Sequence, residues 1–100
     1  MTVVLIGQVR FTPENLEKMK PHIKALVEAT NAKDGCVFYD IAEDLQDPGL
    51  IRFSEEWPDA ESLQGHMTAP HIAPYREASN KYGAHDRKFT VYDAGSSRPL

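Results

Sequence analysis

The segment Leu50–Trp57, with the sequence LIRFSEEW, indicates how this chain folds. Side chains of a β-strand point to its two faces in turn, so Ile51, Phe53, Glu55 and Trp57 share one face. That face combines three large apolar groups with one carboxylate. The pattern is typical of a strand that packs one side against a hydrophobic core.

Glu55 stands out on this face, because a carboxylate buried without a partner is destabilising and has a raised pKa. Arg10 and Arg52 are expected to point to the opposite sheet face. A partner from a helix or from a second subunit is therefore expected. The predicted role of Glu55 is architectural more than catalytic.

Upstream of this strand, residues 3–11 alternate as a strand, and a helix is predicted to follow. Thr12 can cap the helix and Pro13 suits its first position, while apolar residues at helical spacing continue to about Asp34. Pro21 lies inside, where it should kink or break the helix. Residues 36–43 then alternate as another strand, with bulky groups on both faces.

Downstream, Asp59 can cap a short helix that carries His66, and residues 68–70 (Thr-Ala-Pro) interrupt it. A second helical segment is expected to end at Gly83. Residues 88–93 alternate as a last strand. The predicted order is strand, helix, strand, strand, helix, strand, in a single domain over residues 1–100.

This order predicts an α+β fold, in which a four-stranded antiparallel sheet carries its helices on one face. The first two strands have apolar groups on both faces, so the other sheet face needs a cover. A second copy of the chain is the natural cover. We therefore expect a homodimer with facing sheets, in which residues 87–100 reach toward the partner.

The composition excludes several classes of protein. The 100 residues are 41% hydrophobic and 26% charged, with a formal net charge of −4 and no basic stripe, which argues against a nucleic-acid partner. The apolar residues 1–6 are far shorter than a membrane span, so no membrane association is expected. Cys36 is the only cysteine, which excludes an intrachain disulfide and fits a reducing cytoplasm.

Three motifs resemble those of the antibiotic biosynthesis monooxygenase family. They are Asp34-Gly35-Cys36 at a strand start, Glu55-Glu56-Trp57 at a strand end, and residues 66–71 (His-Met-Thr-Ala-Pro-His) on a helix. The resemblance spans nearly the whole chain. It implies a ferredoxin-like βαββαβ fold that pairs into a dimeric α+β barrel. It also implies a pocket between sheet and helices, in which members oxidise phenols, quinols and anthrones with O2 and no cofactor.

Two other branches of the family can be compared with this chain residue by residue. The haem-degrading branch has a Trp where this chain has His66 and its iron-ligating His where this chain has Arg76, so haem is not expected. A branch that processes a phosphorylated signal molecule resembles residues 66–71 and stays an alternative. The sequence contains no G-x-G-x-x-G, phosphate loop or H-E-x-x-H motif, and we expect no cofactor and no bound metal.

His66 and His71 are the predicted catalytic bases, since histidine titrates near neutral pH. On one continuous helix they would lie about 140° apart, which argues against a two-ligand metal site. They could face one pocket only if the break at residues 68–70 reorients the second segment. The alternative is that one of the pair only ties helix to sheet.

A second group of residues is predicted to bind an aromatic substrate. Trp57 could stack on it or donate its indole N–H, although a large aromatic residue in so small a core could equally be packing. The same two interpretations apply to Tyr39, Phe53, Tyr75 and Tyr82. Glu55, on the same strand face as Phe53 and Trp57, completes the group predicted to contact the substrate.

Three functions remain open at this point. The first is a cofactor-free monooxygenase acting on a small aromatic substrate with O2. The second is an isomerase of a small phosphorylated carbonyl compound, which needs converging cations. The third is a dimer that binds a small molecule without turnover, which would leave both histidines without a role.

Overall fold

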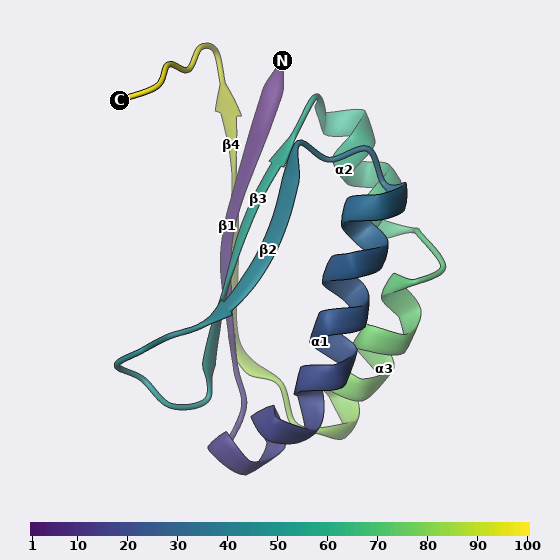
Figure 1. The fold of residues 1–100 in the computed structure, drawn as a ribbon, viewed down its shortest axis with the longest axis vertical. Helices are drawn as coiled ribbons and strands as arrows, with labels where there is room; N and C mark the ends of the chain where they lie inside the picture. Colours follow the sequence, from purple (N-terminus) through teal and green to yellow (C-terminus); the bar gives the residue numbers. More distant parts are fainter.

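A computed structural model describes all residues from 1 to 100, arranged as one sheet with three helices on one of its faces (Figure 1). The elements in chain order are β1 (Thr2–Arg10), α1 (Pro13–Lys33), β2 (Phe38–Glu43), β3 (Leu50–Trp57), α2 (Ala60–Met67), α3 (Ile72–Lys81) and β4 (His85–Ala94). The strands lie in the order β2-β3-β1-β4, and every neighbouring pair is antiparallel. The predicted α+β class and sheet are confirmed.

The local signals in the sequence account for most element boundaries. Thr12 caps α1 by accepting from the backbone N–H of Asn15, and Asp59 caps α2 by accepting from that of Ser62. Gly83 follows α3 with φ of 75°, a left-handed conformation that glycine adopts without strain. The strand bounds Leu50–Trp57 are as predicted.

Pro21 bends α1 without breaking it. The helix runs unbroken from Pro13 to Lys33, and its first turns lie at an angle to the remainder (Figure 1). Pro21 is on the exposed side of the helix, where water can reach the carbonyl that loses its donor.

β1 spans Thr2–Arg10, one residue earlier than the predicted 3–11, and two other strands differ from their predicted extents at their starts. β2 begins at Phe38 instead of Cys36, because Gly35 with φ of 73° turns the chain there, and Val37 still donates to the Glu56 carbonyl at 2.8 Å. β4 begins at His85, three residues earlier than expected, and nearly all its side chains are exposed. Neither change alters the topology.

The core lies between the helices and the inner sheet face. All four predicted inner residues of β3, namely Ile51, Phe53, Glu55 and Trp57, are buried. The helices do not reach across to β4, so this edge of the inner face stays open. None of the three helices is both long and apolar enough to span a bilayer.

Candidate active site

A cavity of about 460 Å³ lies between the inner sheet face and α2 and α3. All seven elements contribute to its wall, and 11 of its 16 lining residues are hydrophobic. Five of the residues predicted for the site line it: Tyr39, Phe53, Glu55, His66 and Tyr75. Its size suits a small organic molecule, and its lining suits one that is largely apolar.

His66 combines burial with a fixed orientation. It lies in the last turn of α2 with its side chain only 3% exposed, and its Nδ1–H donates to Oδ2 of Asp34 at 2.7 Å. Its ring packs between Tyr39 and Trp57, with centroid distances of 5.0 and 5.1 Å. The second ring nitrogen, Nε2, has no hydrogen-bond partner in the chain.

The environment of His66 favours its neutral form. Burial lowers the pKa of His66 below its ordinary value of 6.5, and the hydrogen bond and charge of Asp34 partly oppose that shift. A neutral imidazole whose Nδ1–H is donated to a carboxylate presents Nε2 as a base. His66 therefore has the protonation state and the orientation that a general base requires.

His71 shares the same carboxylate oxygen. Its Nε2–H donates to Oδ2 of Asp34 at 2.7 Å, and its ring centroid is 6.3 Å from that of His66. The break at residues 68–70 thus reorients the second segment, so the separation of about 140° expected for a continuous helix does not apply. His71 does not line the cavity, however.

Asp34 was not predicted as part of the site. It is the C-cap residue of α1, and a capping position gave no reason to expect a contact with residues more than 30 positions away. Ligating atoms of Asp34, His66 and His71 all lie within 4.8 Å of one another. This trio is the group in the chain that could hold a metal ion, although its geometry is fully accounted for by two hydrogen bonds.

The partner of Glu55 corrects the expectation from sequence. Within the chain it comes from the same strand and not from a helix: the indole N–H of Trp57, two residues along the same strand face, donates to Oε1 of Glu55 at 3.0 Å. Glu55 is 3% exposed, and burial raises its pKa to about 7, with the indole hydrogen bond opposing the rise. Trp57 is fully buried and does not line the cavity, so its place is behind His66 and Tyr39.

Tyr75 lines the cavity, and its hydroxyl is buried beside that of Ser79, one helical turn later. Neither hydroxyl has a hydrogen-bond partner of good geometry in the chain, although Ser79 is close enough to lower the pKa of Tyr75 against the effect of burial. Burial raises the pKa of Tyr75, which keeps the hydroxyl protonated at neutral pH. A protonated, unpaired hydroxyl is a donor ready for an oxyanion of a bound molecule.

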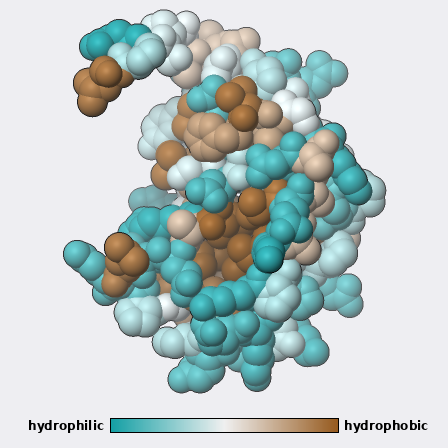
Figure 2. Space-filling view, in the orientation of Figure 1, coloured by the Kyte–Doolittle hydropathy of each residue, from teal (hydrophilic) through white to brown (hydrophobic).

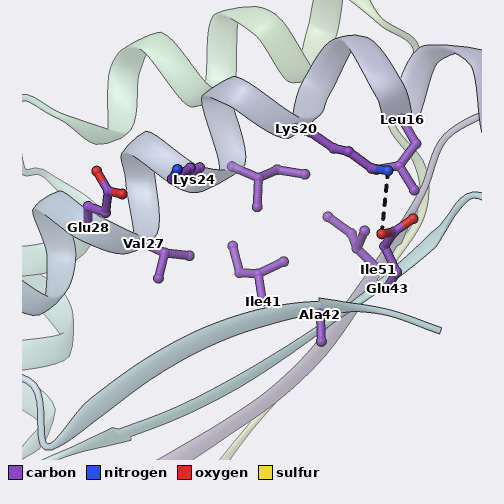
Figure 3. A pocket seen from close by; sticks show the side chains of 10 residues that line it. Leu16, Lys20, Lys24, Val27, Glu28, Ile41, Ala42, Glu43 and Ile51 are labelled. Carbon is purple, nitrogen blue, oxygen red and sulfur yellow. Dashed lines mark ion pairs between the residues drawn. The ribbon is translucent and has the colours of Figure 1, made fainter. Parts of the chain in front are cut away.

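A second hollow of about 510 Å³ lies between α1 and β2. Figure 2 shows it as an apolar depression with a hydrophilic border, and Figure 3 shows Lys20 and Glu43 forming an ion pair at one end, at 3.5 Å. Aliphatic side chains such as Ile41 and Val27 form its floor. No histidine or tyrosine lines it, so it lacks the acid–base groups of the first cavity.

Comparison with known proteins gives one family. The sequence profile described as antibiotic biosynthesis monooxygenase matches residues 2–78. Comparison with curated proteins gives no match.

Solved structures resemble the whole chain. A crystal structure described as an antibiotic biosynthesis monooxygenase is 31% identical, with a TM-score of 0.85 over 94% of this chain and 99% of that one. A protein of Deinococcus radiodurans, provisionally given the same description, is 26% identical, with a TM-score of 0.89 over 98% and 97%. A conserved Bacteroides thetaiotaomicron protein, described as a candidate oxidoreductase, is 26% identical, with a TM-score of 0.81 over 91% and 95%.

Proposed function

Because the chain belongs to the antibiotic biosynthesis monooxygenase family, we propose that it is a cofactor-independent monooxygenase that oxidises a small phenol, quinol or anthrone with O2. The observation that carries the proposal is the placement of His66. Its ring is buried at the wall of a mostly apolar cavity and is oriented by Asp34. The descriptions of the similar structures as monooxygenases or a candidate oxidoreductase point the same way.

The proposed reaction begins with proton transfer from a substrate hydroxyl or activated methylene to Nε2 of His66. The resulting carbanion-like phenolate is electron-rich enough to give one electron to O2, and the radical pair combines to form a C–O bond to a peroxide. The peroxide O–O bond then breaks as the same carbon loses its remaining hydrogen as a proton. One oxygen stays in the product as a carbonyl and the other leaves as water. The substrate thereby supplies all four electrons that reduce O2.

The cavity residues match the needs of this chemistry. Neutral His66 accepts the proton, and the nearby Asp34 carboxylate stabilises the imidazolium that forms. The Tyr75 hydroxyl can donate to the developing oxyanion. The apolar walls exclude water, which protects a reactive anion from protonation by solvent.

Oxygen uptake tests the proposal. Purified protein, treated with a chelator and checked for the absence of haem and flavin absorption, is mixed with quinols, anthrones and catechols in an oxygen electrode. We expect one O2 consumed per substrate, one labelled oxygen atom in the product from ¹⁸O2, and loss of the enzymatic rate in His66→Ala. Uptake no faster than the uncatalysed rate with every compound, or uptake that requires added metal, would contradict the proposal.

We also propose that the working form is a homodimer that covers the outer sheet face. On this face the register aligns Phe38, Glu56, Val4 and Tyr92 in one row across all four strands. Phe38 and Tyr92 are 43% and 55% exposed, and Ile6 beside the row is 49% exposed. A cluster of large apolar groups left in water favours burial against a second copy.

A further inference from the structure

The cavity carries two arginines that have no ion-pair partner in the chain. Arg76 on α3 and Arg87 on β4 both line it, and neither forms a salt bridge. The arginines on the outer sheet face differ. Arg10 pairs with Asp47 and Asp86, and Arg52 pairs with Asp44. Two free cationic groups thus face one cavity in a protein whose net charge is −4.

Both arginines act on the polar groups inside the cavity. The charge of Arg76 contributes to lowering the pKa of His66, and that of Arg87 opposes the burial that raises the pKa of Tyr75. The two guanidinium groups therefore lie within electrostatic reach of the polar groups of the site. They come from different elements, so a ligand that touches both must bridge α3 and β4.

The wall beside Arg87 is aromatic. Phe89 lies two residues further on the same face of β4, and its ring meets that of Phe53 edge to face at 5.1 Å. Tyr75 meets Phe53 in the same way at 6.5 Å. These three rings offer a flat apolar body a place to pack, next to cations that favour an anionic substituent on that body.

We propose that the cavity binds an aromatic compound bearing an anionic substituent, either a carboxylate or a phosphate ester, which Arg76 and Arg87 hold while the ring packs against Phe53 and Phe89. This inference deepens the proposed function, since it assigns a substrate class to the same site. The guanidinium group suits both anions, because its planar donors match their oxygen pairs. The hydroxyl of such a ligand is left to face His66 and Tyr75.

Binding without turnover tests the proposal separately from catalysis. Calorimetry under nitrogen compares three probes: hydroquinone, its carboxylated analogue gentisate, and phenyl phosphate. At least one anionic probe should bind about tenfold or more tightly than hydroquinone, and its affinity should fall as salt rises. Preference for gentisate identifies the carboxylate as the recognised group, and preference for phenyl phosphate identifies the phosphate.

Variants assign the effect to the two arginines. Arg76→Gln and Arg87→Gln should each weaken the preferred anionic probe about tenfold and leave hydroquinone affinity unchanged, which also shows that the cavity is intact. Lys24→Gln is the control, because it removes the same charge from the exposed side of α1, outside both the cavity and the outer sheet face. The proposal is overturned if no anion outbinds hydroquinone, or if the preference persists in the double variant. Because no O2 is present, neither outcome depends on whether the protein oxidises its ligand.

Discussion

Asp34 accepts a hydrogen bond from His66 at 2.7 Å, across 32 residues of sequence. The contact joins the end of α1 to the end of α2 and fixes the imidazole at the cavity wall. His71 donates to the same oxygen from the start of α3. One carboxylate thus links the ends of three helices by hydrogen bonds and orients the proposed base.

The two histidines should differ in their roles. His66→Ala removes a cavity-lining base, so we expect kcat/KM to fall about 10²- to 10⁴-fold, a range typical of a general base. His71→Ala loses a hydrogen bond away from the cavity, so it should lower the melting temperature and keep most activity. Steady-state oxidation of a working quinol and thermal unfolding measure both effects.

His22→Ala is the control for these variants, because His22 is exposed, does not line the cavity and does not contact Asp34. It should leave rate and melting temperature unchanged. Full activity in both His66→Ala and His71→Ala would end the hypothesis of a histidine base.

Asp34→Asn should change the pH dependence of turnover. The asparagine can still accept both hydrogen bonds, but it lacks the charge that raises the pKa of His66. The pKa of His66 should therefore fall further, and the acid limb of the kcat/KM profile should move to lower pH. Loss of a charge-assisted bond worth about 1.5 to 3 kcal/mol predicts a drop of about 10- to 10²-fold in kcat.

Asp40→Asn, on the exposed sheet face, is the control. An acid limb that stays in place or moves upward would show that Asp34 does not tune His66.

Glu55 should make the protein less stable as pH rises. Its folded pKa of about 7 exceeds the ordinary 4.5, so between these values the folded chain keeps a proton that the unfolded chain has lost. The free energy of unfolding should fall through this window, by up to about 3 kcal/mol, and level off above pH 7. Glu55→Gln should remove this fall, because a neutral amide can still accept from Trp57.

Urea unfolding at pH 5 and pH 8 measures the difference between Glu55→Gln and the unaltered protein. The difference isolates Glu55 from His66, whose lowered pKa contributes a slope of opposite sign. Glu77→Gln on the exposed side of α3 is the matched control. If the difference in free energy of unfolding between Glu55→Gln and the unaltered protein is the same at pH 5 and pH 8, the shifted pKa is contradicted.

The fold was predictable because its signals are local. The alternation of residues 50–57, the caps Thr12 and Asp59, and the stop at Gly83 each act within a few residues. The site was only partly predictable. The aromatic residues and His66 follow from strand and helix periodicity, but the contact of Asp34 depends on how two helix ends meet in space.

Two further differences have separate origins. The partner of Glu55 lies two residues away on its own strand face, whereas the sequence pointed to a donor from a helix or from a second subunit. Arg87 lines the cavity because β4 begins earlier than its alternation indicated and no helix covers it. Packing between distant elements decides the surroundings of Arg87, and a single sequence does not display it.

The proposed dimer should depend on the outer sheet face. We expect light scattering to give twice the chain mass at micromolar concentration. Ile6→Lys places a charge within the exposed apolar cluster, so it should shift the protein toward monomer. Leu45→Lys makes the same change at a fully exposed site in the β2–β3 turn and should leave the dimer intact. A monomer in the unaltered protein would refute the dimer.

Gly7 and Phe89 should be energetically coupled. Gly7 lies opposite Phe89 in the register of β1 and β4, and the Phe89 ring occupies the space that a side chain at Gly7 would need. A Cβ at this position would lie 2.1 Å from Cδ1 of Phe89. Because the Phe89 ring is 40% exposed, it can swing aside at the cost of its contact with Phe53.

We therefore expect Gly7→Ala to destabilise the fold by about 1 to 3 kcal/mol, the usual range for overpacking. In a Phe89→Ala background the space is empty, so the same change should cost close to nothing. Urea unfolding of the four proteins gives the coupling energy as a double-mutant cycle. Gly65→Ala is the control: no atom lies within 4 Å of its added methyl group, and alanine in α2 should stabilise the helix by up to about 1 kcal/mol. An equal cost of Gly7→Ala in both backgrounds would mean that the strain arises in the β1 backbone and that Phe89 is not held against Gly7 in solution.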